Sequence, residues 1–148
     1  MTTEELNAII AKAEAGNPEA QNDLGLCFVT GWGVGKDFSK AVEWFTKAAE
    51  QGSAKAQANL GVCFEKGWGV EKSLTKAIEW YLKAAEQGFA QAKIKLPQAY
   101  YDLAHSLGID DINGEGRKYL NIAAERGNEK AKKRDRGLIS ERCGKWRP

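Results

Sequence analysis

The hydrophobic residues of this chain recur at helical spacing. Between residues 20 and 31, apolar and small side chains are separated by three or four positions, which places them on one face of an α-helix. These positions are Ala20, Leu24, Cys27, Phe28 and Gly31. A second stripe of the same kind follows at Ala41, Trp44, Phe45, Ala48 and Ala49. The pattern predicts two amphipathic helices joined by a short connection.

The same helix pair occurs again 36 residues later. Residues 17–52 and residues 53–88 carry the same amino acid at 21 of 36 aligned positions. A more divergent third copy covers residues 89–127 when three inserted residues are allowed, and residues 5–16 match only the second half of a unit. Self-similarity at such a period is typical of helical repeat arrays, so we expect a solenoid of helix pairs.

The residues at the ends of the expected helices support this pairing. Asn17-Pro18 is typical of an N-cap followed by proline at the first helical position, and Asp37 and Ser73 stand where later helices would begin. A glycine follows the last periodic residue of each second helix, as expected at a helix end. These glycines are Gly16, Gly52, Gly88 and Gly127. Each connection inside a regular pair reads Gly-Trp-Gly-Val, and its glycines can take the positive φ of a tight reversal.

The regular copies carry a recognisable pattern. From Ala20 to Gly52 it is AxxxLGxxFxxGxGVxxDxxKAxxWxxKAAxxG, which resembles the Sel-one-like repeat, a relative of the tetratricopeptide repeat. The resemblance implies an all-α fold, a right-handed α-α superhelix of about three repeats with half-repeat caps. It also implies that the first helix of each pair lines a concave surface. Proteins of this kind mostly serve as adaptors that hold other proteins together.

We therefore expect a single repeat domain over residues 1–148. Its expected parts are an N-terminal half-repeat, two regular repeats, a divergent repeat and a basic C-terminal cap, at residues 1–16, 17–52, 53–88, 89–127 and 128–148. In the divergent repeat, Pro97 replaces the glycine found at Gly25 and Gly61. Because proline removes a backbone donor and clashes with the preceding turn, we expect that helix to kink or restart at residue 97.

Composition favours one soluble cytoplasmic domain. The 148 residues are 43% apolar and 28% charged, with a formal net charge of +2. The longest run without a charged residue is 12 residues, from Leu24 to Gly35, whereas a membrane-spanning helix needs about 20. No signal-type segment opens the chain. The odd number of cysteines, three, does not suggest a disulfide framework.

The sequence contains no catalytic constellation. Its one histidine, His105, leaves no paired-histidine metal site. Cys27 and Cys63 lie on apolar helix faces, where we expect buried thiols. The Gly31–Lys36 segment resembles a phosphate loop only weakly, because it connects two helices. We expect no enzyme activity, no cofactor and no metal. The alternative that the resemblance implies is small-molecule binding or a penicillin-binding, β-lactamase-like hydrolase activity, as reported for secreted relatives.

Two groups of residues are candidates for binding a partner protein or peptide. The first group would line the concave groove: Asn22, Leu26, Val29, Ala58, Val62, Glu65, Ile94 and Gln98. Its apolar members suit an extended or helical peptide, or a second copy of the chain in a homodimer, but helices in solenoids also pack on two sides. The second group is Trp32 and Trp68 in the interhelix turns. They would either anchor a partner or fold back over the neighbouring repeat.

The C-terminal 20 residues are basic, with eight lysines or arginines against three acids between Glu129 and Pro148. Such a segment could contact nucleic acid or an acidic partner. It is more simply explained as the polar face of a capping helix, because no nucleic-acid-binding motif accompanies the charge. We therefore do not expect a nucleic-acid partner.

Overall fold

The structure, a computed structural model, describes residues 2–108 and 114–134. Its helices are α1 (Thr3–Glu14), α2 (Pro18–Thr30), α3 (Phe38–Glu50), α4 (Ala54–Lys66), α5 (Leu74–Glu86), α6 (Ala90–Leu107) and α7 (Glu115–Glu125). Residues 129–134 are also helical. The described ranges contain no strand. The predicted all-α fold of consecutive helix pairs is confirmed.

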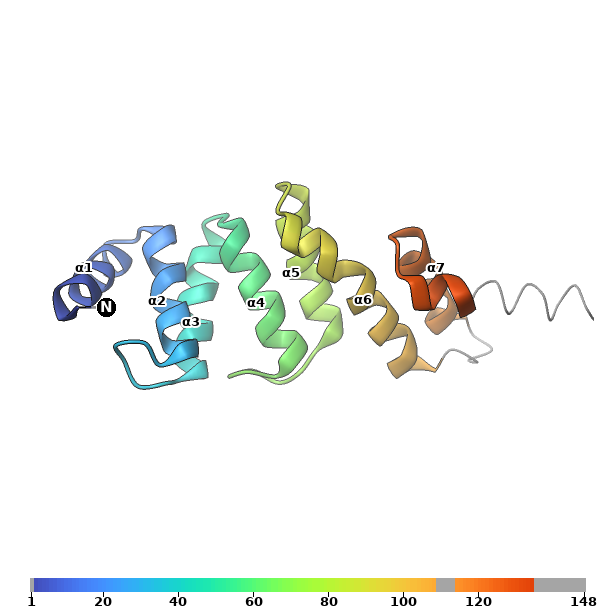
Figure 1. The fold of residues 1–148 in the computed structure, drawn as a ribbon, viewed down its shortest axis with the longest axis horizontal. Coiled ribbons are helices and arrows are strands. Elements are labelled where there is room, and N and C mark those ends of the chain that lie inside the picture. Colours follow the sequence, from blue (N-terminus) through green and yellow to red (C-terminus); the bar gives the residue numbers. More distant parts are fainter. Residues whose placement is uncertain (1, 109–113, 135–148) are drawn as a thin grey trace, which may run out of the picture. The chain divides into compact units, whose positions relative to one another are not determined.

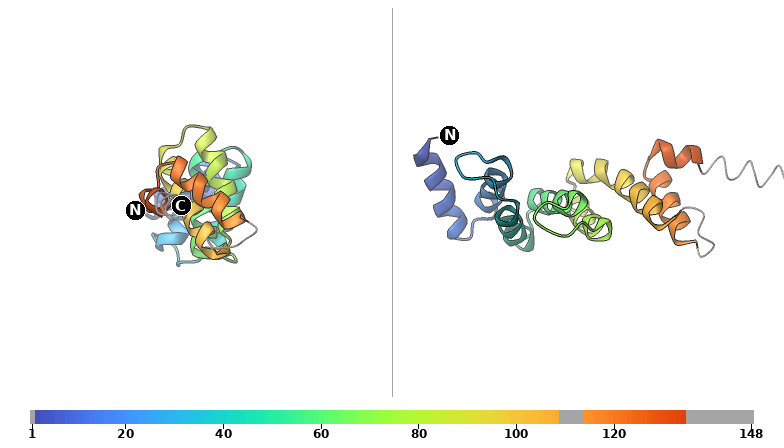
Figure 2. Two further views of the ribbon diagram at one scale, coloured as in Figure 1. Left: turned by 90° about the vertical axis from the view of Figure 1, so that its right-hand side faces the viewer. Right: turned by 90° about the horizontal axis from the view of Figure 1, so that it is seen from below.

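The chain forms two compact units, Met1–Ala92 and Lys93–Pro148. In the first unit, helices that follow one another in the sequence are also neighbours in space. α1 packs on α2, α2 on α3, α3 on α4 and α4 on α5 (Figures 1 and 2). α1 therefore packs against α2 in the way that α3 packs against α4.

The predicted helix starts are confirmed by hydrogen bonds. The side chain of Asn17 accepts a hydrogen bond from the amide of Ala20 at 3.0 Å, with Pro18 as the first residue of α2. Asp37 and Ser73 cap α3 and α5 in the same way. At the other end of α2, Gly31 has a φ of 74° and its amide donates to the carbonyl of Cys27 at 2.8 Å. That left-handed conformation starts the reversal towards α3.

Close approach of a glycine to a ring joins the two helices of each regular repeat. Gly25 in α2 faces the ring of Phe45 in α3, and Gly61 in α4 faces the ring of Tyr81 in α5. Both rings are fully buried. The hydroxyl of Tyr81 donates a 2.6 Å hydrogen bond to the carboxylate of Glu65. The glycine columns of the sequence thus mark places where helix backbones nearly touch an aromatic side chain.

Two buried glutamines connect three helices each. Gln21 Nε2 donates to the carbonyl of Ala13 at 3.1 Å, and Gln21 Oε1 accepts from Gln51 Nε2 at 2.8 Å. In the next repeat, Gln57 makes the equivalent bonds to the Ala49 carbonyl at 3.3 Å and to Gln87 at 2.9 Å. Each glutamine therefore links the C-terminal ends of the second helices that precede and follow it. No role was predicted from the sequence for Gln21 or Gln57, although they occupy the same position in the two regular repeats.

The divergent repeat, most of which belongs to the second unit, is packed by different side chains. Tyr100 of α6 stacks on Tyr119 of α7 with ring centroids 6.1 Å apart, and the Arg126 guanidinium lies 5.5 Å from the Tyr100 centroid. α6 is one helix of 18 residues that continues through Pro97, so the predicted restart at this residue does not occur. In the sequence column of Phe45 and Tyr81 this repeat has Leu120, which is fully buried. Leucine is smaller than either ring, and the proline occupies the column where the other repeats need glycine.

Candidate partner-binding site

Trp68 lies folded back on the preceding repeat. Its ring stacks on Phe38, the first residue of α3, with centroids 5.1 Å apart and planes inclined by 20°. The Lys36 ammonium lies 5.0 Å from the Phe38 centroid. Trp68 also packs against the core cluster that contains Phe45 and Leu60. Much of this tryptophan is therefore used in a contact between repeats.

Trp32 has the equivalent position one repeat earlier and a different environment. Its side chain is 58% exposed, whereas Trp68 is half-buried. The residue 36 positions before Phe38 is Thr2, and the residue 36 positions before Phe45 is Ile9. Thr2, the N-cap of α1, and Ile9 within α1 therefore offer Trp32 no aromatic ring, whereas α3 has phenylalanine at both equivalent positions.

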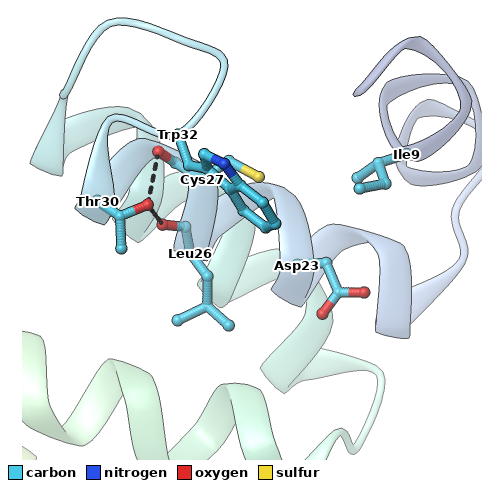
Figure 3. A pocket seen from close by; sticks show the side chains of 6 residues that line it. All are labelled: Ile9, Asp23, Leu26, Cys27, Thr30 and Trp32. Atoms are coloured by element: carbon cyan, nitrogen blue, oxygen red, sulfur yellow. Dashed lines mark hydrogen bonds between the residues drawn. The ribbon is translucent and has the colours of Figure 1, made fainter. Parts of the chain in front are cut away.

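A pocket of about 460 Å³ lies beside Trp32 (Figure 3). It is lined by Ile9 of α1, by Trp32 in the turn, and by Asp23, Leu26, Cys27 and Thr30 of α2. In Figure 3 the Trp32 ring lies over α2 next to Cys27, and Ile9 stands on the opposite side. A second hollow of about 450 Å³ shares Ile9 and Trp32 and continues along α1. Its other lining residues are Glu5, Ala8 and Lys12.

The polar groups in the pocket wall do not make a reactive site. The Thr30 hydroxyl donates to the carbonyl of Leu26 at 2.9 Å within α2. Burial, and secondly the charge of Asp23, raise the pKa of the Cys27 thiol. A thiol with a raised pKa is a poor nucleophile at neutral pH. The pocket is an apolar surface with a carboxylate at its edge, and such a surface can bind an apolar side chain.

Half of the predicted groove positions are used in packing. Asn22 and Ala58 are buried, and Asn22 Oδ1 accepts a 2.8 Å hydrogen bond from Asn59 Nδ2, which joins α2 to α4. Val29 packs against the core cluster around Phe45. Glu65 is half-buried and accepts the hydrogen bond from Tyr81 described above.

The other predicted positions are more accessible. Val62 is half-buried, Leu26 is 40% exposed and Ile94 is 75% exposed. Gln98 is exposed and bonds to Asp102 at 2.8 Å. Ile94 and Gln98 belong to the second unit.

The pocket combines residues from both predicted groups with one that was missed. Leu26 comes from the groove positions and Trp32 from the turns, and the structure brings them together around Ile9. Ile9 belongs to the half-repeat, which was expected to act as a cap. Its alignment with Phe45 at the 36-residue offset was the signal that could have identified it.

The described part of the chain has neither a cluster of metal ligands nor a membrane-spanning helix. Among residues 2–108 and 114–134, no group of three or more His, Cys, Asp or Glu side chains could hold a metal ion. No helix in these ranges is long and apolar enough to cross a membrane. Cys143 and most of the basic segment, from residue 135 onward, lie outside the described residues.

Comparison with known proteins agrees with this architecture. The sequence profile of the Sel1 repeat matches residues 18–53, 54–89 and 97–128. No protein with a curated description matches the chain.

The solved structures that are similar to this chain include two repeat proteins. A Sel1 repeat protein from Oxalobacter formigenes is 38% identical with a TM-score of 0.58, over 79% of this chain and 47% of that protein. The protein c5321, a protective antigen of uropathogenic Escherichia coli strains displaying an SLR fold, is 32% identical with a TM-score of 0.66. That alignment covers 87% of this chain and 27% of c5321, so the chain spans less than half of either protein. Proteins with this repeat fold generally act as protein-interaction scaffolds. The chain belongs to the Sel1 repeat family.

Proposed function

We propose that this chain is a non-catalytic protein-interaction module that binds a partner protein or peptide at the pocket between α1 and α2. One observation carries the proposal: Trp32 and Leu26, 58% and 40% exposed, stand together around an apolar pocket of about 460 Å³. Exposed large apolar residues that adjoin a hollow are typical of interaction sites. Tryptophan is also enriched among the residues that dominate binding energy.

The groove predicted from the sequence supplies a path away from this pocket. Val29 lies one turn beyond Leu26 in α2, and Val62 has the same repeat position as Leu26 in α4. Both valines are half-buried, so a bound segment would cover their remaining exposed surface. A peptide anchored at Trp32 and Leu26 could therefore continue over α2 towards α4.

A second candidate function, binding of a small apolar molecule, is favoured by the size of the pocket. Pockets for small ligands usually enclose about 300–1,000 Å³ and present a few convergent polar groups. The volume here falls in that range, but the Thr30 hydroxyl already bonds to the backbone of its own helix. Hydrolysis has less support, because burial raises the pKa of the one thiol in the pocket wall.

Photo-crosslinking tests the proposed function. The crosslinker benzoylphenylalanine would replace Leu26 in the pocket, and Ile94, an exposed apolar residue of the second unit, would serve as the matched control. We expect the Leu26 probe to crosslink a protein from the native cell lysate, and we expect Trp32→Ala to abolish that product. Identical products from both positions, or products insensitive to Trp32→Ala, would show that the pocket is not the binding site.

A further inference from the structure

We propose that the pocket beside Trp32 receives the side chain of a phenylalanine in a short basic segment of the partner. This inference rests on the proposed function and names the chemistry of the occupant. It follows from comparing two equivalent edges of the same molecule. One edge, at Trp68, is filled by residues of this chain, and the other, at Trp32, is open.

The filled edge shows what a tryptophan in this turn binds. Trp68 stacks on Phe38 at a centroid distance of 5.1 Å, and the backbone of Gly69 lies directly against the backbone of Phe38. A β-carbon on Gly69 would be 2.5 Å from the Phe38 carbonyl carbon, so the glycine lets the turn approach this main chain while Trp68 contacts the ring. Trp68 also packs against the core cluster in which Phe45 lies with Leu60 of α4.

The open edge lacks both phenylalanines. Thr2 and Ile9 stand in their places, and the pocket of about 460 Å³ lies next to Ile9 and Cys27. A phenylalanine side chain from outside could occupy the space beside Ile9 and use the exposed ring of Trp32 as its stacking partner. The occupant is a short segment, since α1 already covers the side of α2 where a complete repeat would contribute its second helix.

Charge determines the residues expected next to that phenylalanine. Glu5 and Asp23 are exposed at the two hollows, with Lys12 as the one cation in their lining. Between residues 2 and 30 the chain carries five acids and one lysine. A positively charged segment is therefore complementary to this edge. The filled edge also places a cation beside a phenylalanine, because the Lys36 ammonium lies 5.0 Å from the centroid of the Phe38 ring.

The chain itself provides a probe for the test. The acetylated, amidated hexapeptide Gly-Lys-Asp-Phe-Ser-Lys copies residues 35–40, which contain the natural neighbour of Trp68. Its binding to the full chain would be followed through the indole N–H resonance of Trp32, assigned by its disappearance in Trp32→Phe. We expect a saturable shift with a Kd on the order of millimolar, since so small a ligand buries little more than one ring. The peptide with alanine in place of phenylalanine should bind about tenfold more weakly or worse.

A variant that fills the pocket from within supplies the matched control. Ile9→Phe places on α1 the residue that α3 has at the equivalent position, and we expect it to abolish the Trp32 shift without lowering the Tm. Ile94→Phe, which enlarges an exposed residue of the second unit, should leave the shift unchanged. If Ile9→Phe does not fold, Trp32→Ala provides the same contrast, read from the backbone amides of α2.

Three results would overturn the inference. They are equal affinity for the alanine peptide, a shift that survives in Ile9→Phe, and a shift that arises with rising protein concentration alone. The last result would assign the pocket to a second copy of the chain. If the hexapeptide fails but crosslinks from Leu26 still depend on Trp32, only the phenylalanine assignment is wrong. If those crosslinks are also missing, the proposed function is wrong.

Discussion

The ring of Tyr81 lies so close to Gly61 that a methyl group on this glycine would sit 2.6 Å from Tyr81 Cε1. Gly25 stands in the same relationship to Phe45 one repeat earlier. Both rings are buried in tightly packed surroundings and have little room to move. The two regular repeats therefore depend on the absence of a side chain at one position of their first helix.

Gly61→Ala should lower the free energy of unfolding by about 1–3 kcal/mol, because the ring or the helix must shift to accommodate the methyl group. Gly35→Ala is the matched control: a β-carbon there meets nothing within 4 Å, so its effect should stay within about 0.5 kcal/mol. Urea unfolding followed by circular dichroism measures both. Equal stability of the two variants would show that α4 and α5 are not closely packed at this point.

Replacement of the two turn tryptophans should have unequal effects. Trp68→Ala removes the stack on Phe38 and should destabilise the chain by about 2–4 kcal/mol, whereas Trp32→Ala should cost less than about 1 kcal/mol. Thermal unfolding of the two variants provides the comparison. The expectation fails if Trp32→Ala is as destabilising as Trp68→Ala.

Loss of the buried glutamine Gln57 should be costly because two hydrogen bonds are lost with it. Gln57→Ala leaves the Ala49 carbonyl and the Gln87 amide without their partner, which should cost about 1–3 kcal/mol. Gln91→Ala, at an exposed position of α6, should change stability by less than about 0.5 kcal/mol. A double-mutant cycle of Gln57 with Gln87 would isolate the energy of their bond, and a coupling near zero would contradict this role.

Stability should fall in alkaline solution because of Cys63. Burial raises the pKa of this thiol from its ordinary 9.0 to about 11, so the folded chain keeps a proton that the unfolded chain releases. The contribution is complete below pH 9 and is lost as the pH rises towards 11, at up to about 1.4 kcal/mol per pH unit. Burial and the hydrogen bond to Glu65 also raise the pKa of Tyr81, which adds a second loss above pH 10.

The check is urea unfolding at several pH values between 8 and 10. Cys63→Ala should reduce the slope of stability against pH in this range. An unchanged slope would show that Cys63 does not hold its proton more tightly in the folded chain.

The regular repeats could be predicted because their sequence signals are local. The apolar stripes, the caps at Asn17 and Asp37, and the glycine ends each depend on residues within one or two helical turns. The Pro97 helix was predicted less well. Local rules alone predict a kink or a restart at a proline, whereas α6 continues through Pro97 without a restart.

The candidate site could be predicted only in part, because exposure depends on which helix covers which. Periodicity places Asn22 and Leu26 on the same side of α2, yet α4 buries Asn22 through Asn59 and leaves Leu26 exposed. Likewise, Trp32 and Trp68 are indistinguishable by position in the repeat. Their exposure differs because Trp68 stacks on Phe38 of α3, whereas the residue equivalent to Phe38 beside Trp32 is Thr2, at the start of α1.

The two hydrogen bonds of Gln57 join residues 53–88 to the end of α3 and to the end of their own second helix, α5. An added copy of these 36 residues would therefore carry a glutamine with both hydrogen-bond partners available. At the next equivalent position the sequence has Lys93, and the first compact unit ends at Ala92. An array of this type can thus be lengthened by duplication inside its first unit, and such an insertion would keep the spacing of the helices on either side.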